Sequence, residues 1–542
     1  MQVYMYFIPL LNKQRLTMEN GVLTDSVAYF VEEIRNKHEI DLKSITVDKA
    51  VPSKEFLVLL DSVRLRRQFG CDISEEVVLK KIDNFLQKEN FTVSYKLFND
   101  PIFGNIKVHP VAQIIIDTPQ FQRLRHIKQL SSLSYVYPGA TGTRFDHSLG
   151  VYHLAGELVS TLRDKQPELE LTKIDCLCVQ LAGLCHDLGH GPFSHLFEVI
   201  VNSLPGTSRK VWQHENNSIK MLDHIYSNGD TRRALHSWGI CDEDIEFIKA
   251  LMRGESDHVD SEKTGRDDSK SFLYQIVANK ENGMDVDKWD YLARDAHYLG
   301  IKINFEYQRL LYHLRVMEVS GRPQICVRDK EADSVFNLYS TRYSLHKQAY
   351  QHPVGRAVEL MIKDAIVLAA PHLRIRGKSL LECLDDMERY TLLTDSIFYK
   401  ILDSEEIELA GARHILERLQ KRKLYKCVEQ AEVSKRNGET PEGLRNQLAN
   451  ELGGTDFTVS LTIRHFGKEN ANPLDSIWFY KKQDLVQPFQ LTKEQKSLLT
   501  PVQFQDKALT AFCKAEVVKD EHYERVREVF DRYNLLPRIS HG

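Results

Sequence analysis

The chain has 542 residues, of which 42% are hydrophobic and 27% are charged, and its formal net charge is −4. This composition is that of a soluble globular protein of two to four domains. It excludes a global positive field that would attract nucleic acid. The nine cysteines include no Cys-x-x-Cys pair, which indicates reduced thiols in the nucleus or cytoplasm. The first apolar run is short and is interrupted by Pro9, so we expect neither a signal peptide nor a membrane span.

Residues 1–94 contain several amphipathic runs. The clearest follows Ser74, a candidate helix cap, and places Val78, Ile82 and Phe85 on one face. We therefore predict a helical N-terminal region, and we assign it to no known module.

Residues 95–430 consist mostly of amphipathic helices joined by polar loops, with a predicted hairpin over 316–327. The pattern then changes. Residues 429–455 are polar and rich in glycine, which predicts a loop, and the alternation over 457–464 predicts a half-buried strand. Residues 476–481 are a candidate partner for that strand, and 520–533 form a predicted helix. We expect a mainly α fold with a helical core over 95–430 and a small α+β C-terminal lobe over 431–542.

One stretch, residues 181–195, gathers three histidines and an aspartate in an apolar setting. His186 and His190 are four residues apart and would share a helix face, with Asp187 beside them. Pro192 is expected to end the helix, so a different segment would hold His195. A satisfied buried His–Asp pair is the simpler interpretation of one dipeptide. Four polar side chains at an apolar helix end favour a metal site instead.

Such a site needs further ligands, and the chain offers two candidates. His147 lies in Arg-Phe-Asp-His-Ser-Leu-Gly, and Asp287 lies in an acidic run that continues to Asp295. Imidazole ligands suit zinc, iron or manganese. The order His147, His186-Asp187, Asp287 resembles the metal ligands of the HD phosphohydrolase superfamily.

Longer motifs narrow the resemblance. The segments LFNDPIFGNIKVHP, YPGATGTRFDHSLGV, LAGLCHDLGHGPFSH, GMDVDKWDYLARDAHYLGI and TRYSLHKQAYQHPVG resemble the animal SAM-and-HD-domain deoxynucleoside triphosphate triphosphohydrolases. The resemblance covers about residues 96–426. It implies a metal-dependent HD catalytic domain over 95–430 that cleaves a dNTP to deoxynucleoside and inorganic triphosphate, with water attacking the α-phosphorus. It also implies magnesium on the nucleotides, GTP and dNTP as activators, and a homotetramer to which the 431–542 lobe contributes. A role in lowering dNTP pools and in antiviral defence would follow.

The leaving oxygen must also be protonated, and histidines are the candidate acids. We expect His195 or His190 in this role, with Glu198 one turn after His195 to raise the pKa of its imidazole. The resembling family has an aspartate at the position of Glu198. The resemblance adds His214 as a phosphate contact.

Residues for substrate binding come partly from charge and partly from the resemblance. Arginine suits phosphate oxygens, and an apolar wall would leave a 2′-hydroxyl without a partner. Taken singly, Leu130 and Tyr350 would be ordinary core residues. The predicted substrate residues are Gln129, Leu130, Arg144, Lys288, Tyr291, Asp295, Arg342, Tyr350 and Gln351.

The resemblance also implies nucleotide-filled allosteric sites between subunits, and Asp117, Gln122 and Arg125 match the guanine-reading motif. The predicted allosteric residues are Lys96, Leu97, Asn99, Asp117, Gln122, Arg125, Val136, Tyr137, Arg309, Arg328, Lys330, His352, Arg422, Lys426 and Lys514. Four positions depart from the family pattern: Phe103, Ser334, Gln348 and Pro353. The last two replace cations and weaken the case for the second, deoxynucleotide activator.

Two alternatives belong to other functional classes. One is an HD-type nuclease or phosphodiesterase, and the other is a single-stranded nucleic-acid binder that retains the fold. The acidic net charge and the lack of a stripe of aromatic and basic residues argue against the binder.

Overall fold

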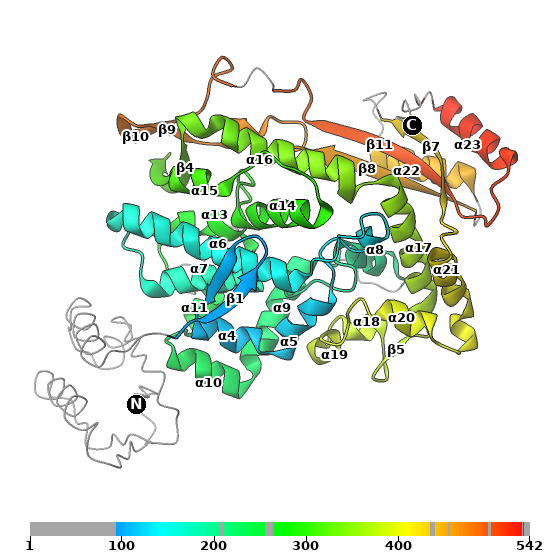
Figure 1. The fold of residues 1–542 in the computed structure, drawn as a ribbon, viewed down its shortest axis with the longest axis horizontal. Coiled ribbons are helices and arrows are strands. Elements are labelled where there is room, and N and C mark those ends of the chain that lie inside the picture. Colours follow the sequence, from blue (N-terminus) through cyan, green and yellow to red (C-terminus); the bar gives the residue numbers. More distant parts are fainter. Residues whose placement is uncertain are drawn as a thin grey trace, which may run out of the picture. The chain divides into compact units, whose positions relative to one another are not determined.

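The computed structural model describes residues 94–205, 211–254, 264–433, 440–453, 456–496, 500–533 and 535 (Figure 1). They fall into two compact units. The described part of the first unit joins 94–99, 105–118 and 225–245, and the second joins 100–104, 119–224 and the residues from 246 onward. The helical runs predicted over residues 1–93 lie outside the described residues. Among the helices that are described, none combines the length and apolarity that a membrane crossing requires.

The first unit is built around two helices, α4 (Pro110–Ile116) and α10 (Gly229–Ser237). Proline at the first position suits a helix start, because its missing N–H has no partner there, and His109 Nδ1 accepts a hydrogen bond from the backbone N–H of Val111. The ring of Trp238 meets His109 edge-on. Strands β1 (Lys96–Asp100) and β2 (Gly104–Val108) form a two-stranded sheet.

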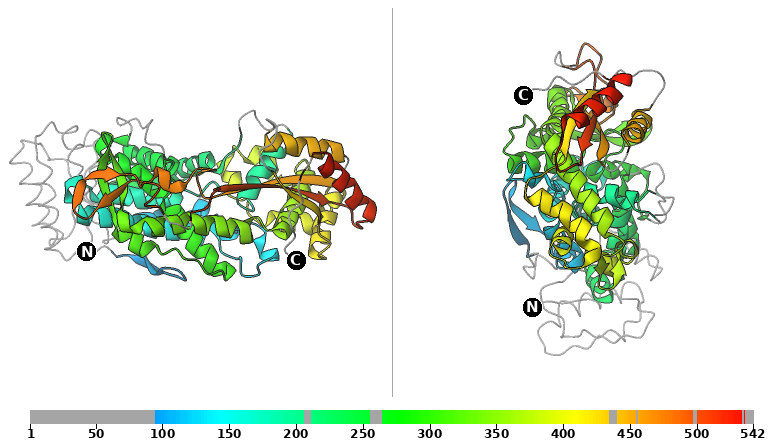
Figure 2. Two further views of the ribbon diagram at one scale, coloured as in Figure 1. Left: turned by 90° about the horizontal axis from the view of Figure 1, so that it is seen from above. Right: turned by 90° about the vertical axis from the view of Figure 1, so that its right-hand side faces the viewer.

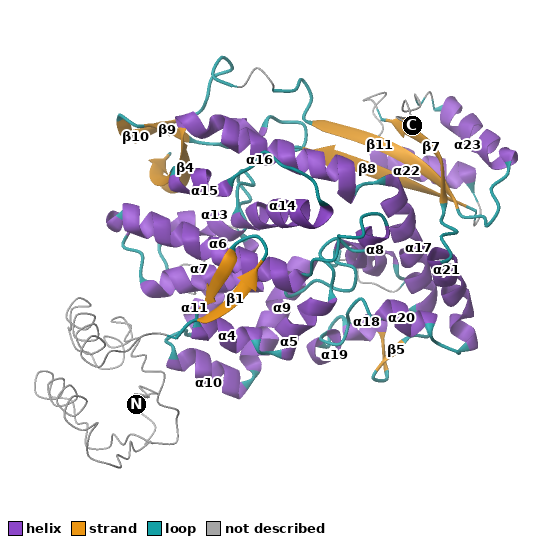
Figure 3. Cartoon of the chain, in the orientation of Figure 1, coloured by secondary structure: helices purple, strands orange, loops and turns teal. Residues whose placement is uncertain are grey.

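The second unit is mainly helical (Figure 3), as the sequence predicted. Its centre is the long helix α6 (Arg144–Lys165), against which α7 (Lys173–Cys185) and α14 (Val286–Leu299) pack. Helices α6 and α7 each begin with a capping box, at Thr143 and Thr172. Helix α14 approaches α6 at Gly150, where a Cβ would lie 1.7 Å from an Asp290 carboxylate oxygen. Only glycine fits at that crossing.

The second unit contains further helices, and α9 and α11 each have one end in the first unit. The α-helices are α5 (Pro119–Gln122), α8 (His195–Ser203), α9 (His214–Ser227), α11 (Asp242–Arg253), α13 (Tyr274–Val277), α15 (Tyr307–Tyr312), α16 (Ala332–Leu345), α17 (Pro353–Ala369), α18 (Leu380–Cys383), α19 (Met387–Tyr390), α20 (Ile397–Leu402) and α21 (Ala410–Gln420). The short 3₁₀ helices are η1 (Arg123–His126), η2 (Leu133–Tyr135), η3 (Pro167–Leu169), η4 (Asp268–Leu273), η5 (Asp329–Glu331), η7 (Ile407–Leu409) and η8 (Pro473–Ser476), and η6 (His346–Tyr350) is a π-helical turn.

A four-stranded sheet confirms one strand prediction and corrects another. Strands β3 (Leu314–Val319) and β4 (Arg322–Arg328) form the predicted hairpin. Strand β9 (Phe479–Lys481) pairs with β4 in parallel and with β10 (Asp484–Phe489), in the order β10-β9-β4-β3. The prediction that 476–481 pairs with the 457–464 strand is therefore wrong, because the hairpin offers β9 an edge.

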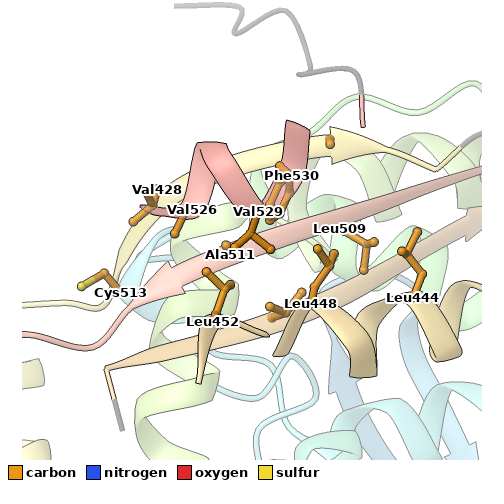
Figure 4. Packing of buried hydrophobic residues seen from close by; sticks show 12 residues of the cluster. Val428, Leu444, Leu448, Leu452, Leu509, Ala511, Cys513, Val526, Val529 and Phe530 are labelled. Carbon is orange, nitrogen blue, oxygen red and sulfur yellow. The ribbon is translucent and has the colours of Figure 1, made fainter. Parts of the chain in front are cut away.

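The C-terminal lobe has a three-stranded sheet in the order β7-β11-β8, from β7 (Lys426–Glu432), β8 (Phe457–His465) and β11 (Gln505–Cys513). Strands β8 and β11 run side by side (Figure 2). Helices α22 (Pro441–Leu452) and α23 (Asp520–Arg532) pack on the sheet around Leu448, Leu509 and Phe530 (Figure 4). The predicted strand and final helix are confirmed. The loop predicted over 429–455 is wrong for 429–432, which end β7, and for 441–452, which form α22. Leu444, Leu448 and Leu452 form a helical stripe that this core buries.

Candidate metal centre and its surroundings

Three helix ends position four ligand-type side chains in the second unit. His147 lies in the first turn of α6, His186 and Asp187 follow the end of α7, and Asp287 lies in the first turn of α14. Helix α7 ends at Cys185, and residues 186–189 form a turn. The expectation that His186 and His190 share a helix face is therefore wrong. The turn instead carries Asp187 to the same centre as its neighbour.

The donor atoms of these four side chains converge. His147 Nε2 lies 3.1 Å from Asp287 Oδ1, 3.4 Å from Asp187 Oδ2 and 3.2 Å from His186 Nε2. His186 Nε2 lies 3.4 Å from Asp187 Oδ1 and 3.5 Å from Asp287 Oδ1. The His147 side chain is 1% exposed and that of Asp287 is 31% exposed, so the centre opens to solvent on the Asp287 side.

The tautomers of the two histidines favour a cation at this point. His147 Nδ1 donates to Asp290 Oδ2 at 2.7 Å, and His186 Nδ1 donates to the Gly183 carbonyl at 2.8 Å. With both Nδ1 atoms protonated, both Nε2 atoms present lone pairs toward each other and toward two carboxylates. This arrangement is repulsive unless a proton or metal ion lies between the groups. Two imidazoles and two carboxylates fit a divalent transition metal such as zinc, iron or manganese.

The electrostatics of the ligands agree with this interpretation. Burial lowers the pKa of His147, but hydrogen bonding to Asp287 and Asp290 outweighs this effect and raises the pKa to about 10. Burial raises the pKa of Asp287, but contact with the two histidines outweighs this effect and holds the pKa well below its usual range. The charges that raise the affinity of the histidine for a proton also attract a metal ion.

Asp290 is a residue whose role the sequence did not reveal. It is fully buried on α14, where its carboxylate accepts from His147 and from Arg294, and Arg294 also donates to Asp100 at 2.8 Å. Carboxylate partners of this kind fix the tautomer and orientation of a ligating histidine. The sequence signal for this role is that Asp290 follows the predicted ligand Asp287 by three residues, which places the two carboxylates close together on one helix face.

Arg144 was predicted to bind substrate phosphate, and here it lies inside the centre. It is 4% exposed, donates to Asp187 Oδ2 at 2.6 Å and donates to Ser194 Oγ at 2.9 Å. Its guanidinium therefore balances the charge of Asp187.

The three remaining histidines of the predicted catalytic group meet beside this centre. The rings of His190 and His214 stack at 3.8 Å with an interplanar angle of 19°, and His195 meets both rings edge-on. Stacked rings have nearly parallel planes, so their in-plane lone pairs do not point to one ion. The geometry favours proton transfer or phosphate binding over a second metal site.

The partner predicted for Glu198 requires correction. Its carboxylate accepts from the ring and the backbone N–H of His214 rather than from His195. The pKa of His195 is accordingly not raised. Loss of hydration, together with repulsion from Arg144 and His214, lowers the pKa of His195 to about 4.

Two of the predicted substrate residues, Tyr350 and Asp295, contact each other. The Tyr350 hydroxyl donates to Asp295 Oδ2 at 2.7 Å, and burial raises the pKa of Asp295 to about 7. Gln129 is buried and Leu130 is half-buried. Tyr291 experiences the charges of Lys288 and Arg342. Lys288 itself pairs with Asp285 at 2.9 Å.

The C-terminal lobe also reaches this region, which the sequence did not predict. Gln351 donates to the Ile463 carbonyl at 2.9 Å, and Arg464 donates to Gln351 Oε1 at 3.0 Å. Arg342 donates to the His465 carbonyl at 2.6 Å. Arg464 ends the alternating stretch 457–464 that predicted a half-buried strand, and nothing in that pattern distinguished it from a solvated charge. The end of β8 therefore holds two of the predicted substrate residues.

The predicted allosteric residues lie in several separate places. Within the second unit, the Tyr137 hydroxyl donates to the Gln348 carbonyl, His352 caps α17, and Arg309 pairs with Glu331. Others are paired or exposed: Arg125 lies over the Phe145 ring, Gln122 accepts from Arg125, Arg328 pairs with Asp329, Arg422 donates to Tyr135, Lys514 pairs with Asp364, Val136 is half-buried, and Lys330 and Lys426 are exposed. In the first unit, Lys96, Leu97, Asn99 and Asp117 are exposed. Sites between copies of the chain thus stay a prediction.

Comparisons with known proteins place this centre in a family context. The HD domain family matches residues 144–295, the span from the start of α6 to Asp295. The chain is 44% identical over 445 residues to "Deoxynucleoside triphosphate triphosphohydrolase SAMHD1" of Gallus gallus, covering 78% of this chain and 72% of that protein. The protein of the same name from Danio rerio is 45% identical over 462 residues, with 81% and 74% covered. That from Homo sapiens is 43% identical over 459 residues, with 80% and 73% covered.

Proposed function

The chain belongs to the family of SAMHD1 deoxynucleoside triphosphate triphosphohydrolases, and from this premise we propose that it hydrolyses dNTPs to deoxynucleoside and inorganic triphosphate. The observation that carries the proposal is the convergence of His147, His186, Asp187 and Asp287 beside a separate cluster of three histidines, one of which, His190, lies 3.4 Å from Asp187 Oδ1. Metal-assisted hydrolysis needs both parts, one to hold the ion and one to move protons.

In this proposal the four ligands hold zinc, iron or manganese, and magnesium accompanies the nucleotide. A bound transition metal lowers the pKa of its water and polarises the phosphoryl group. His195 then protonates the leaving 5′ oxygen. Its pKa of about 4 belongs to the protein without substrate, and the negative charge of an approaching triphosphate raises it toward the range of a usable acid. Glu198 keeps His214 oriented through its ring and backbone N–H.

Charge and shape would then position the substrate. Arg342 and Lys288 would neutralise the triphosphate, and Tyr291, which lies within the field of both cations, would contact the substrate beside them. Leu130 and Tyr350 form the wall that leaves a 2′-hydroxyl unpaired. Such a wall alone rejects a ribonucleotide by only ~10². The fixed geometry of Gln351, held on both sides of its amide by β8, supports a tighter selection.

Regulation is the least direct part of the proposal. GTP would bind at the motif containing Asp117, Gln122 and Arg125 and promote a homotetramer, to which the 431–542 lobe contributes. The deoxynucleotide activator would bind weakly, because Gln348 and Pro353 supply no cation. Such an enzyme would lower dNTP pools and so restrict viral replication. We place it in the nucleus or cytoplasm, since the cysteines of the described residues are free thiols and most are buried.

The test is to incubate the protein with dGTP and GTP and to resolve the products. Inorganic triphosphate and deoxyguanosine are expected. Pyrophosphate with dGMP, or cleavage of an added oligonucleotide, would instead show a nuclease or phosphodiesterase. Binding of single-stranded nucleic acid without any hydrolysis would overturn the enzymatic proposal.

A further inference from the structure

The segment that precedes His195 is strained. Phe193 has φ of 62° and Ser194 has φ of 56°, so two consecutive residues with side chains adopt the left-handed region that favours glycine. Such a conformation persists only where surrounding contacts hold it. His195 begins α8 directly after these two residues. The position of its ring therefore depends on whatever holds this turn.

The carboxylate of Asp395 binds this turn through the backbone N–H of Phe193. Asp395 Oδ1 accepts from the Phe193 N–H at 2.7 Å, and its Oδ2 accepts from the Lys128 N–H at 2.9 Å. The backbone N–H of Asp395 in turn donates to the His126 carbonyl at 3.1 Å. Asp395 thus ties the turn before His195 to the segment that leads into Gln129, although 202 residues separate it from Phe193.

A buried arginine, Arg123, holds the adjoining turn by donating hydrogen bonds to the backbone carbonyls of that turn. Arg123 is 4% exposed and donates to the carbonyls of Leu188 at 3.0 Å, His190 at 2.8 Å and Leu393 at 2.8 Å. The Leu188 and His190 carbonyls belong to the turn that follows Asp187. The Leu393 carbonyl lies two residues from Asp395. The Arg123 and Asp395 side chains therefore join the same three segments, which are 123–128, 188–193 and 393–395. Arginine suits this task because its planar fork offers several donors in fixed directions.

We propose that Arg123 and Asp395 are positioning residues for catalysis, a clamp that fixes the metal-ligand turn and the acid His195 in one geometry. The clamp touches neither substrate nor metal and acts through backbone N–H and C=O groups. Ser194 completes it, since its hydroxyl donates to the Lys128 carbonyl at 2.7 Å. The role of His195 in this inference rests on the proposed function, whereas the clamp itself does not.

The first experiment tests the clamp without substrate. Asp395→Asn preserves size, but its amide offers one acceptor oxygen where two N–H groups need one each. Hydrogen exchange at the Phe193 and Lys128 segments should become at least ~10-fold faster, with metal content unchanged. Asp403→Asn, at an exposed position on the same stretch of chain, should leave both segments unchanged. Equal exchange in the Asp395→Asn variant and the parent protein would overturn the clamp.

The second experiment tests the link to the acid. The substrate is dGTP or its analogue with sulfur in place of the bridging 5′ oxygen, whose thiolate leaves without protonation. Asp395→Asn should lose at least ~10-fold in kcat on dGTP, as misplacement of a general acid implies. Its loss on the sulfur analogue should stay within about threefold, with KM unchanged for both substrates. Arg123→Lys, which keeps the charge but loses the fork, should show the same selectivity.

The two experiments separate the possible failures. Equal losses on both substrates would mean that the residues only stabilise the fold, and no loss on either would mean that the turn needs no clamp. Both results overturn the positioning role. If the parent protein hydrolyses neither substrate, the proposed function fails, while the exchange experiment still decides whether Asp395 holds the turn.

Discussion

The carboxylate behind His147 allows a quantitative test of the metal centre. Asp290 is fully buried, accepts from His147 Nδ1 at 2.7 Å and binds Arg294 through both its oxygens. Asp290→Asn keeps the shape and removes the charge. It also lets an amide N–H face either the histidine or the arginine. Loss of such a partner typically weakens metal binding ~10- to 100-fold, which is about 1.4–2.7 kcal/mol.

The stability of the variant should fall by less than the ~3–5 kcal/mol expected when a buried ion pair loses one partner, because Arg294 retains Asp100 at 2.8 Å. The variant should therefore fold and bind metal weakly. Metal content after dialysis against graded chelator, measured by elemental analysis, gives the shift in affinity. Added metal should restore activity to Asp290→Asn, since all four proposed ligands remain.

The matched control is Asp164→Asn, an exposed carboxylate on the same helix as His147. It should retain metal as the parent protein does. If Asp290→Asn holds its metal against chelator as firmly as the control, the carboxylate does not orient the ligand and the reasoning fails.

The proposed roles lead to four further predictions. Asp187→Ala should lose both metal and activity, and full metal content by elemental analysis would contradict its role as a ligand. His195→Ala should keep its metal and lose at least ~10² in kcat, so loss of metal or activity within a few-fold of the parent would exclude it as the acid. The double substitution Gln348→Arg and Pro353→Lys should lower the dNTP concentration that gives half-maximal tetramer at fixed GTP, because each restored charged contact contributes ~1.5–3 kcal/mol. Mass photometry that shows no shift in this concentration would contradict the prediction. The pKa of Asp295 is about 7 in the folded protein, above its unfolded value, so the free energy of unfolding falls as pH rises through 7. The free energy of unfolding of Asp295→Asn, relative to the parent protein, should therefore be about 1 kcal/mol higher at pH 8 than at pH 6. Thermal or denaturant unfolding that shows the same difference at both pH values would contradict this.

Secondary structure was predictable wherever a local pattern dominated. The hairpin at β3 and β4, the strand β8 and the helix α23 all follow from periodicity within ten or so residues. Strand partners did not follow, because β9 pairs with β4 across about 150 residues, and nothing in its own short sequence selects that edge over β8. The polar stretch that becomes α22 was also missed, since its leucine stripe has meaning only against the core in Figure 4.

The sequence by itself supplied the candidate metal ligands: the adjacent His186 and Asp187, and His147 and Asp287, whose order along the chain resembles that of the HD superfamily. That these four residues bind a metal stays a prediction. Only the tertiary structure decided which partners orient them. Glu198 bonds to His214 rather than His195, and Asp395 holds a turn 202 residues away. The physical reason is that a hydrogen bond depends on distances of about 3 Å between atoms, and such distances between remote segments are set by how helices pack, which local periodicity does not encode.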